Sequence, residues 1–308
     1  MKLAFCSIVL VACGLTGVAN AGDLEPASTP NWYLDINALI LNRSTPDGGA
    51  IVASNPGGVP FLSSGDLDFD MSPGIDASIG FNAFANEWIE ARVMYTKTDG
   101  KNSMISPGNF IGVGFTGPGG TTFSSNFRTT FGSAEINWRH SFNDHLSVLA
   151  GPRALDVDDM LRTVLNNNVA TGRYDAKNRL YGAQIGAEMS FLDDSSPFEL
   201  MLSGKVGAYA NRSSAGIREF QGDNFIGSFE SGNDTKTSYV AEIGLTAGYQ
   251  LSESLTLTAG YQAVWLDNLA LASNAASESL LNPSLLRNSI FRDDLWLHGA
   301  SIGLQISF

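Results

Sequence analysis

Residues 66–70 have the side chains of a metal-binding loop. They read D-L-D-F-D, the D-x-D-x-D spacing in which carboxylate oxygens bind calcium. A calcium loop of this kind also needs Gly at its sixth position and Glu at its twelfth, but Met71 and Ala77 stand there. Because apolar residues continue to alternate through the segment, a strand is the favoured interpretation, and specific calcium binding is the less favoured one.

Residues 112–117 read G-V-G-F-T-G and match the G-x-G-x-x-G pattern of dinucleotide-binding turns. That chemistry needs a strand before the motif and a helix after it, so that the phosphates meet the helix N-terminus. Here the motif lies in a Gly-rich stretch, which favours a flexible loop. We therefore expect no cofactor, no metal site and no catalytic residue.

The clearest structural element in the sequence is its last stretch, residues 296–308. Every second residue there, from Trp296 to Phe308, is apolar or aromatic apart from His298, and the residues between them are mostly small or polar. Because successive side chains of a strand point to opposite faces, this stretch predicts a β-strand with one apolar face. In a membrane barrel that face meets lipid, and the small polar face lines the lumen.

The same alternation recurs along the chain and predicts ten strands. Their approximate ranges are 31–43, 66–84, 88–97, a strand ending near 142, one starting at 145, and then 181–191, 198–210, 239–249, 255–265 and 296–308. Four short turns lie at 85–87, 143–144, 193–197 and 252–254. The long connections between them cover about 44–65, 98–126, 166–177, 211–236 and 267–294.

This order predicts an all-β fold, namely a transmembrane antiparallel up-and-down β-barrel with long extracellular loops. We expect about ten strands, with eight and twelve as the limits. Pro152 should mark a bulge or a break in alternation, because proline cannot donate to the ladder. Residues 156–165 fit either a continued strand or a helical turn. The alternative fold is a periplasmic β-sandwich, which would need a second buried layer and shorter loops.

Outward-facing aromatic residues gather near both predicted ends of the barrel, as in the aromatic girdles of membrane barrels. At the predicted periplasmic end they are Trp32, Trp138, Phe191, Phe198, Tyr249 and Phe308. At the predicted outer end they are Tyr95, Tyr181, Tyr239, Trp265 and Trp296. A sandwich leaves these two groups unexplained.

Charged residues occupy the predicted inward face of nearly every strand. The predicted lumen charges are Asp35, Asp76, Glu90, Arg92, Glu135, Arg139, Arg153, Glu188, Glu199, Lys205 and Glu242. A barrel of about ten strands is narrow, so charges on facing walls would pair and fill it. We therefore expect little or no steady conductance. A water-filled pore with weak cation preference is the alternative.

The end of the chain resembles the C-terminal strand of Gram-negative outer-membrane barrels. Those strands end in an aromatic residue preceded by alternating apolar residues, and here the matching residues are Phe308, Ile306, Leu304 and Ile302. The resemblance implies that the barrel-assembly machinery recognises this strand. The chain as a whole also resembles planctomycete outer-membrane barrel families and the Legionella-type major-outer-membrane-protein family. The run at 149–155, L-A-G-P-R-A-L, is similar to an L-x-G-x-R-Y-L run there, with Ala154 in place of Tyr.

The first 21 residues predict a secretory signal peptide, with Lys2, an apolar run and an A-x-A site ending at Ala21. Lipidation at Cys13 is the alternative to cleavage after Ala21. Residues 22–308 then form a single barrel domain. Both cysteines, Cys6 and Cys13, fall in the signal, so the mature chain has no disulfide and no thiolate chemistry.

Composition and the histidines narrow the function. A formal net charge of −13 argues against nucleic acid as a partner. His140 and His145 flank a predicted periplasmic turn, and His298 faces outward, so an outer-membrane hydrolase is the less favoured function. We expect an integral protein of the cell outer membrane with a structural or surface-interaction role; a porin-like channel is the alternative. Its expected partners are outer-membrane lipid, lipopolysaccharide, the assembly machinery and a ligand of the outer loops.

Overall fold

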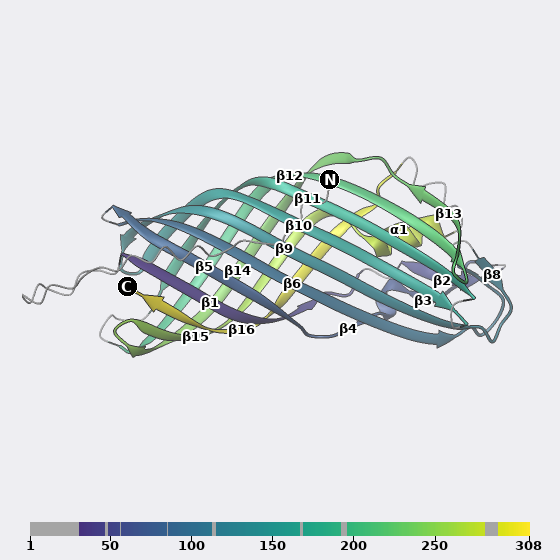
Figure 1. The fold of residues 1–308 in the computed structure, drawn as a ribbon, viewed down its shortest axis with the longest axis horizontal. Helices are drawn as coiled ribbons and strands as arrows, with labels where there is room; N and C mark the ends of the chain where they lie inside the picture. The colour runs from purple at the N-terminus through teal and green to yellow at the C-terminus, as the bar shows by residue number, and fades with distance from the viewer. Residues whose placement is uncertain are drawn as a thin grey trace, which may run out of the picture.

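Antiparallel strands close into a ring in the computed structural model of this protein. The structure describes residues 31–46, 49–55, 57–84, 86–112, 115–166, 169–191, 196–280 and 289–308. The all-β antiparallel barrel is confirmed (Figure 1). The ten strands of the ring are β1 (Trp32–Arg43), β5 (Ser72–Phe84), β6 (Glu87–Ile105), β9 (Thr122–Asn143), β10 (Leu146–Leu165), β11 (Ala170–Ser190), β12 (Phe198–Gln221), β14 (Asp234–Ser252), β15 (Leu255–Ala270) and β16 (Arg292–Ser307). Neither the predicted signal peptide nor most of the turn at 193–197 lies within the described residues.

The ring closes between its first and last strands. β1 and β16 pair from Tyr33 opposite Ser307 to Arg43 opposite Leu297. Beyond them, the backbone N–H of Phe308 donates to the carbonyl of Trp32, and the Trp32 N–H donates to the carbonyl of Phe308, both at 2.9 Å. The last residue of the chain is therefore bonded into the closing seam. In the described part of the chain no helix has the length and apolarity needed to cross a membrane.

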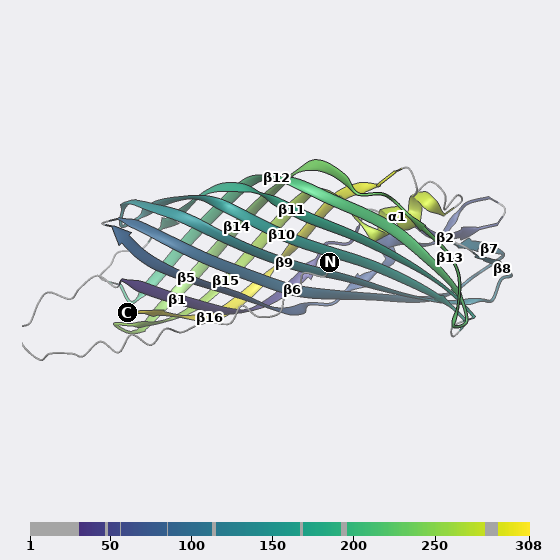
Figure 2. The same cartoon turned by 45° about the horizontal axis from the view of Figure 1, so that its top comes forward.

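We call the end of the barrel that carries the short turns the turn end, and the opposite end the far end. The small elements lie in the half toward the far end, with β4 nearest the middle of the barrel (Figures 1 and 2). They are the separate sheet of β3 (Pro60–Ser63), β2 (Ala50–Ser54), β7 (Phe110–Gly112) and β8 (Phe115–Gly117), together with η1 (Ser64–Asp66), β4 (Asp68–Phe69), β13 (Asn224–Glu230) and α1 (Ala272–Ser279). β4 pairs with β6, and β13 pairs with β12.

Several predicted loop ranges were wrong because the strands continue far beyond them. β6 and β9 pair as far as Ile105 opposite Thr122, and together with β7 and β8 they make most of 98–126 strand. β11 and β12 pair as far as Ala170 opposite Gln221, so most of 166–177 and 211–221 is strand as well. The open question at 156–165 is settled in favour of a continued strand. In the opposite direction, the strand predicted at 66–84 begins its long ladder only at Ser72.

The expected bulge at Pro152 is absent. Pairing between β10 and β11 runs in one register from Leu146 to Leu165, and alternation is kept, with Arg153 buried inside. On the other side, the ladder with β9 resumes at Arg153 in the register it had at Ala150. Proline therefore interrupts one ladder locally without shifting the strand, because only its own N–H is missing.

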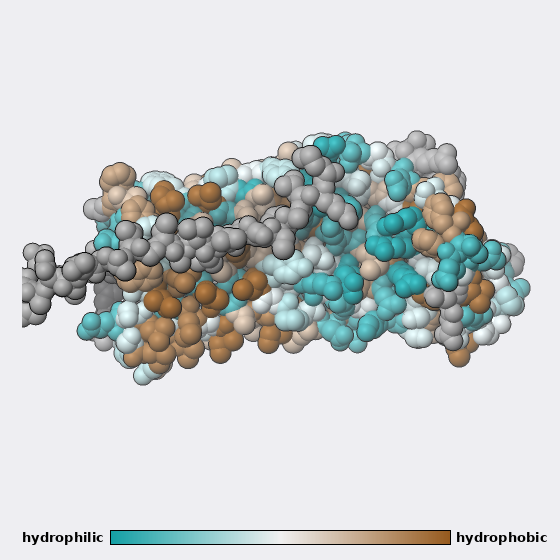
Figure 3. Space-filling model, in the orientation of Figure 1, coloured by the Kyte–Doolittle hydropathy of each residue, from teal (hydrophilic) through white to brown (hydrophobic). Residues whose placement is uncertain are grey.

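The outer surface differs between the two halves of the barrel. Apolar side chains gather over the half near the turn end, and polar side chains predominate beyond the middle, with apolar patches again at the tip of the far end (Figure 3). On the turn half, outward residues such as Ile136, Ile185 and Ile302 are more than half exposed. Exposed apolar side chains in a continuous belt are the pattern of a surface that meets lipid.

Candidate functional site

An ion pair crosses the interior of the turn half. Arg92 on β6 binds Asp76 on the neighbouring β5 through two hydrogen bonds, Nε to Oδ1 at 2.8 Å and Nη2 to Oδ2 at 2.6 Å. The same guanidinium donates to Glu242 on β14. Since β6 and β14 are separated by other strands in both directions around the ring, this contact bridges the lumen.

Glu135 on β9 joins further charges to this bridge. Its carboxylate lies 3.2 Å from Nε of Arg153 and 3.8 Å from Nη1 of Arg92, and it accepts a hydrogen bond from Lys205. Arg153 Nη2 in turn lies 3.0 Å from Glu242 Oε2. We call these residues the ion-pair layer: Asp76, Arg92, Glu135, Arg153, Lys205 and Glu242. Each of their side chains is at most 14 % exposed, so every charge depends on its partners.

A second group of charges lies closer to the turn end. Arg139 donates to both Glu90 and Glu188, the latter at 3.1 Å. The Tyr33 hydroxyl donates to Glu90, and the Arg139 guanidinium lies 5.9 Å from the centre of the Tyr33 ring. The sequence makes room for this ring with a glycine, because a Cβ at Gly80 would overlap it.

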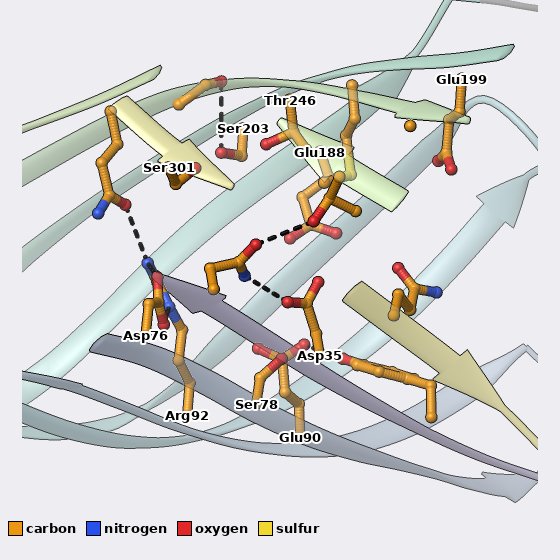
Figure 4. A pocket seen from close by; sticks show the side chains of 18 of the residues that line it. Asp35, Asp76, Ser78, Glu90, Arg92, Glu188, Glu199, Ser203, Thr246 and Ser301 are labelled. Atoms are coloured by element: carbon orange, nitrogen blue, oxygen red, sulfur yellow. Dashed lines mark hydrogen bonds and ion pairs between the residues drawn. The ribbon is translucent and has the colours of Figure 1, made fainter. Parts of the chain in front are cut away.

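Between these groups the lumen holds a polar cavity of about 390 Å³ (Figure 4). Its walls combine carboxylates with small hydroxyl side chains, including Ser78, Ser203, Thr246 and Ser301. Asp35 lines it and accepts a hydrogen bond from the Asn37 amide, whereas Glu199 lines it at the exposed turn end. All eleven predicted lumen charges thus lie around this cavity or in the ion-pair layer.

Beyond the ion-pair layer the interior becomes apolar, which the sequence reasoning missed. The apolar layer consists of inward residues from most strands of the ring: Leu39, Leu41, Met94, Phe131, Leu155, Val157, Leu180, Tyr209, Val240, Val264, Leu266, Leu269, Leu271, Leu295 and Leu297. All of these residues are buried. In the strands that contribute to this layer, they come after the inward polar residues on the way to the far end, so they lie across the lumen as a band.

The far half is filled by a second apolar cluster, which we call the plug core. It joins inward ring residues to β2, β7, the segment around β4, and α1: Ile51, Val52, Ala53, Leu62, Leu67, Phe69, Phe110, Phe123, Phe127, Leu161, Leu165, Tyr174, Ala176, Ala215, Ile217, Ala270, Ala272, Ala275, Ala276 and Leu280. Phe110 packs edge-on against Phe123 at 4.6 Å between ring centres, and Phe69 against Phe127 at 5.3 Å. β2, β3, β7, α1 and the segment around β4 are therefore packed into the barrel as well as connecting its strands.

A buried ion pair and an asparagine tie the plug core to the wall. Arg43 Nη1 lies 2.6 Å from Asp159 Oδ1, and both side chains are at most 1 % exposed. The other oxygen of Asp159 accepts the backbone N–H of Ala272 at the start of α1, at 2.9 Å. Asn178 donates to the carbonyl of Ala270 and accepts its N–H, at 2.9 and 2.8 Å. The sequence reasoning missed Arg43 and Asp159, although each occupies an inward-facing position in the alternation of its own strand.

The remaining predicted sites lie apart from this interior. Ile302, Leu304, Ile306 and Phe308 are exposed on the outer face at the closing seam. His298 also faces outward, with Nδ1 2.7 Å from the Tyr261 hydroxyl.

The two sequence motifs fall in the small far-end elements. Within the D-x-D-x-D segment, Asp66 belongs to η1 and accepts hydrogen bonds from the N–H and hydroxyl of Ser63. The G-x-G-x-x-G segment spans β7 and β8, and residues 113–114 lie outside the described residues. Among the described residues, no group of three or more His, Cys, Asp or Glu side chains is placed to hold a metal ion.

Solved structures share this fold at low sequence identity. The outer membrane protease OmpT from Escherichia coli matches with a TM-score of 0.52 and 13 % identity, over 91 % of this chain and 98 % of that one. The translocator domain of the autotransporter NalP from Neisseria meningitidis matches with a TM-score of 0.44 and 11 % identity, over 92 % and 91 % of the two chains. At 13 % identity the likeness to OmpT shows the barrel fold alone.

A search of curated protein sequences finds no match. A family model, in contrast, matches residues 109–308, which is more than half of the chain. The matched part runs from β7 to the last residue and contains most of the ion-pair layer and the closing strand. The chain belongs to the family described as "Putative beta barrel porin-7 (BBP7)" and, by that family and its fold, is an outer-membrane β-barrel protein.

Proposed function

We propose that this protein sits in the cell outer membrane as a closed barrel and serves as a rigid anchor that displays its far end at the cell surface. The observation that carries this proposal is that three successive layers of side chains block the interior of the ring. A molecule entering from the turn end meets the ion-pair layer, then the apolar layer, and then the plug core. Apolar constrictions stop ions by losing their water, which is how hydrophobic gates close channels.

The orientation follows from the belt and the connections. Short turns face the periplasm and longer connections face outward in single-chain outer-membrane barrels, which puts the turn end inside and the far end outside. The strands then continue past the lipid belt as a wall of polar outer surface. Binding residues are most often found on segments held by a rigid scaffold, and the far-end elements are held by the plug core.

β13 is the part of the far end that best fits a surface-interaction role. It lies at the end of the sheet order and pairs with β12 through one of its edges. Phe225 and Ile226 on this strand are 58 % and 53 % exposed. A free edge with exposed apolar side chains is a surface on which another chain can add a strand. The ligand expected for the outer loops would bind there.

We also propose that the barrel is not an enzyme. His140 lies 2.8 Å from Glu87 beside the turn at 144–145, and His298 is bonded to Tyr261 on the lipid-facing side. Neither arrangement offers a nucleophile and a base in one cleft. Detectable hydrolysis of peptide, phospholipid or lipid A ester substrates by the purified barrel, abolished by His298→Ala, would contradict this part of the proposal.

The alternative is a porin-like channel, and the family description is the observation that favours it. A channel would require β2, β7 and α1 to leave the plug core and the side chains of the apolar layer to move aside. Planar-bilayer recording of the purified protein separates the two functions. The anchor predicts little or no steady conductance, with mild cation preference in any residual current because acids outnumber bases among the predicted lumen charges. Large and stable openings in the unaltered protein would establish the porin instead.

Assembly would use the closing strand. We propose that the barrel-assembly machinery recognises the outward residues Ile302, Leu304, Ile306 and Phe308. Deletion of Phe308 should sharply lower the yield of heat-modifiable barrel in the membrane fraction, whereas Gln305→Ser, on the lumen side, should leave it unchanged. Equal yields for the two variants would remove the assembly role from Phe308.

A further inference from the structure

Arginines stand directly opposite one another on the outer face of β10, β11 and β12. Arg179 on β11 pairs in register with Arg212 on β12. Farther toward the far end, Arg173 on β11 is opposite Arg162 on β10 and also opposite Arg218 on β12. Like charges on directly opposite residues destabilise a sheet, because their Cβ atoms lie only about 5 Å apart. Such pairs on a protein with a formal net charge of −13 need a compensating anion.

The acidic side chains nearby compensate only part of this charge. Asp175 binds both Arg173, at 2.8 Å, and Arg218. Arg179 contacts Asp156 and lies 3.2 Å from Asp158. We call the cations of this surface the basic face: Arg162, Arg173, Lys177, Arg179, Arg212 and Arg218. Asp156, Asp158 and Asp175 are the carboxylates that pair with Arg173, Arg179 and Arg218.

In the pair of Arg179 and Arg212, only Arg179 has carboxylate partners among the described residues. Arg212 is exposed between the buried Asn211 and Ser213, so its side chain projects outward. It makes no hydrogen bond or ion pair with another residue in the described part of the chain. An exposed arginine held opposite a second arginine offers two guanidinium groups to one anion, and phosphate suits that geometry because it accepts several hydrogen bonds at once.

An apolar groove of about 810 Å³ lies on the same strands, toward the turn end. Small residues form its floor, among them Ala187, Gly204 and Ala241, and larger side chains such as Ile185 and Val206 form its rims. Arg179 and Arg212 are six residues along their strands from Ile185 and Val206, with Tyr181 between. At about 3.3 Å per residue and a tilt of about 40°, the guanidinium pair lies roughly 15 Å above that row.

We propose that the basic face and the groove below it bind one acylated, phosphorylated glycolipid of the outer leaflet. The acyl chains lie in the groove, and a phosphate of the headgroup bridges Arg179 and Arg212. Anionic groups farther out on the headgroup contact Lys177 and the arginines nearer the far end, Arg162, Arg173 and Arg218. Charge complementarity selects an anionic lipid, and an apolar groove about 15 Å from the arginine pair, within the reach of an acyl chain, selects an acylated one. This site does not depend on whether the lumen conducts.

The test measures binding of bis-phosphorylated lipid A to the detergent-solubilised barrel by native mass spectrometry. The unaltered protein should retain one lipid, and Arg212→Glu should weaken binding about tenfold or more, since a charge-assisted contact is replaced by repulsion. Lys101→Glu is the matched control, because Lys101 is an exposed lysine on β6, away from the basic face. It should bind like the unaltered protein.

Two further arms distinguish the sources of binding. Dephosphorylated lipid A should bind the unaltered protein no better than Arg212→Glu binds the intact lipid. Excess inorganic phosphate should not displace the lipid, because the acyl chains hold it in the groove. If Arg212→Glu fails the heat-modifiability test for folding, Arg212→Gln takes its place. Equal binding by the arginine variant and the unaltered protein, equal binding of dephosphorylated lipid, or displacement by free phosphate would each overturn the proposal.

Discussion

Along β9 the two halves of the barrel exchange their faces. In the turn half, Ile136 and Trp138 are about half exposed on the outside, while Glu135 and Asn137 are buried inside. In the far half, Phe123, Phe127 and Phe131 are buried inside at 1 % exposure or less. The outward residue Arg128 there is 46 % exposed and pairs with Asp99. One strand thus has a lipid-facing pattern over one half and a water-facing pattern over the other.

The difference shows that the medium outside the ring decides which residues line its interior. Where lipid covers the outside, apolar residues can face outward at no cost, and the interior is left to polar groups that must satisfy one another. Where water covers the outside, the apolar residues are driven inward, and the interior becomes a packed core. The far half is therefore built like a soluble barrel placed on top of a membrane barrel.

The largest effect should come from breaking the charge pair inside the far half. Asp159→Ala leaves Arg43 buried without its partner and removes the acceptor at the start of α1. We expect a loss of about 3–5 kcal/mol in the free energy of unfolding, measured by urea titration of the folded barrel. The double variant Arg43→Met and Asp159→Leu should regain most of that loss, because no lone charge remains. Equal losses in the single and double variants would contradict the assignment of this half as a dry core.

A slightly smaller effect should follow from cutting the core itself. Phe127→Ala removes a ring that is 1 % exposed and packs against Phe69, so we expect a loss of about 3–4 kcal/mol. Ile136→Ala on the same strand faces the lipid belt, where acyl chains can fill the space, and should cost about 1 kcal/mol or less. The same urea titration compares the two. Similar losses at both positions would mean that the halves do not differ in packing.

The sequence predicted the turn half well because the apolar residues of each strand there stay on one face, the outer one. The outward residues of β9 from Ala134 and of β16 from Trp296 are apolar at every second position except His140 and His298, and inward charges such as Asp35 and Glu242 occupy the opposite face of their strands. Phe308 and the short turns fixed the direction and the count of strands. Since Asn143 lies at a two-residue connection between paired strands, even the turn positions could be read from the chain.

The far half was read as loops because the apolar residues change phase. In β9 they lie at odd positions up to Phe131 and at even positions from Ala134, so a search for one continuous apolar face ends there. The segment of β6 beyond Lys97 has inward Thr98 and Gly100, which carry no apolar signal. The change of phase was itself a detectable sign. The docking of β2, β7 and α1 was not, because contacts between distant segments leave no periodic pattern.

The smallest effect should appear on the water-facing outside of the far half. Burial raises the pKa of the Asp175 carboxyl, but hydrogen bonds and charges from Arg173 and Arg218 outweigh it and hold the pKa below its usual value. The carboxylate therefore stabilises the fold above the ordinary pKa of aspartate, and that contribution is lost as the pH falls through the lowered value. Asp175→Asn should cost about 1 kcal/mol or less near neutral pH. Urea titrations should show the two proteins converging in acid; a gap that widens there would refute the pairing.

Thiol accessibility tests the contrast between the halves most directly. The chain has no cysteine after Cys13, so single cysteines can be introduced without competitors. Ser301→Cys places a thiol in the polar cavity, and Ala176→Cys places one in the plug core, where the native residue is 1 % exposed. A charged, membrane-impermeant thiol reagent should modify the first faster by about a hundredfold or more, because reaching the second requires the core to open. Similar rates at both positions would show that water fills the whole lumen. That result would refute the proposal that the lumen is closed.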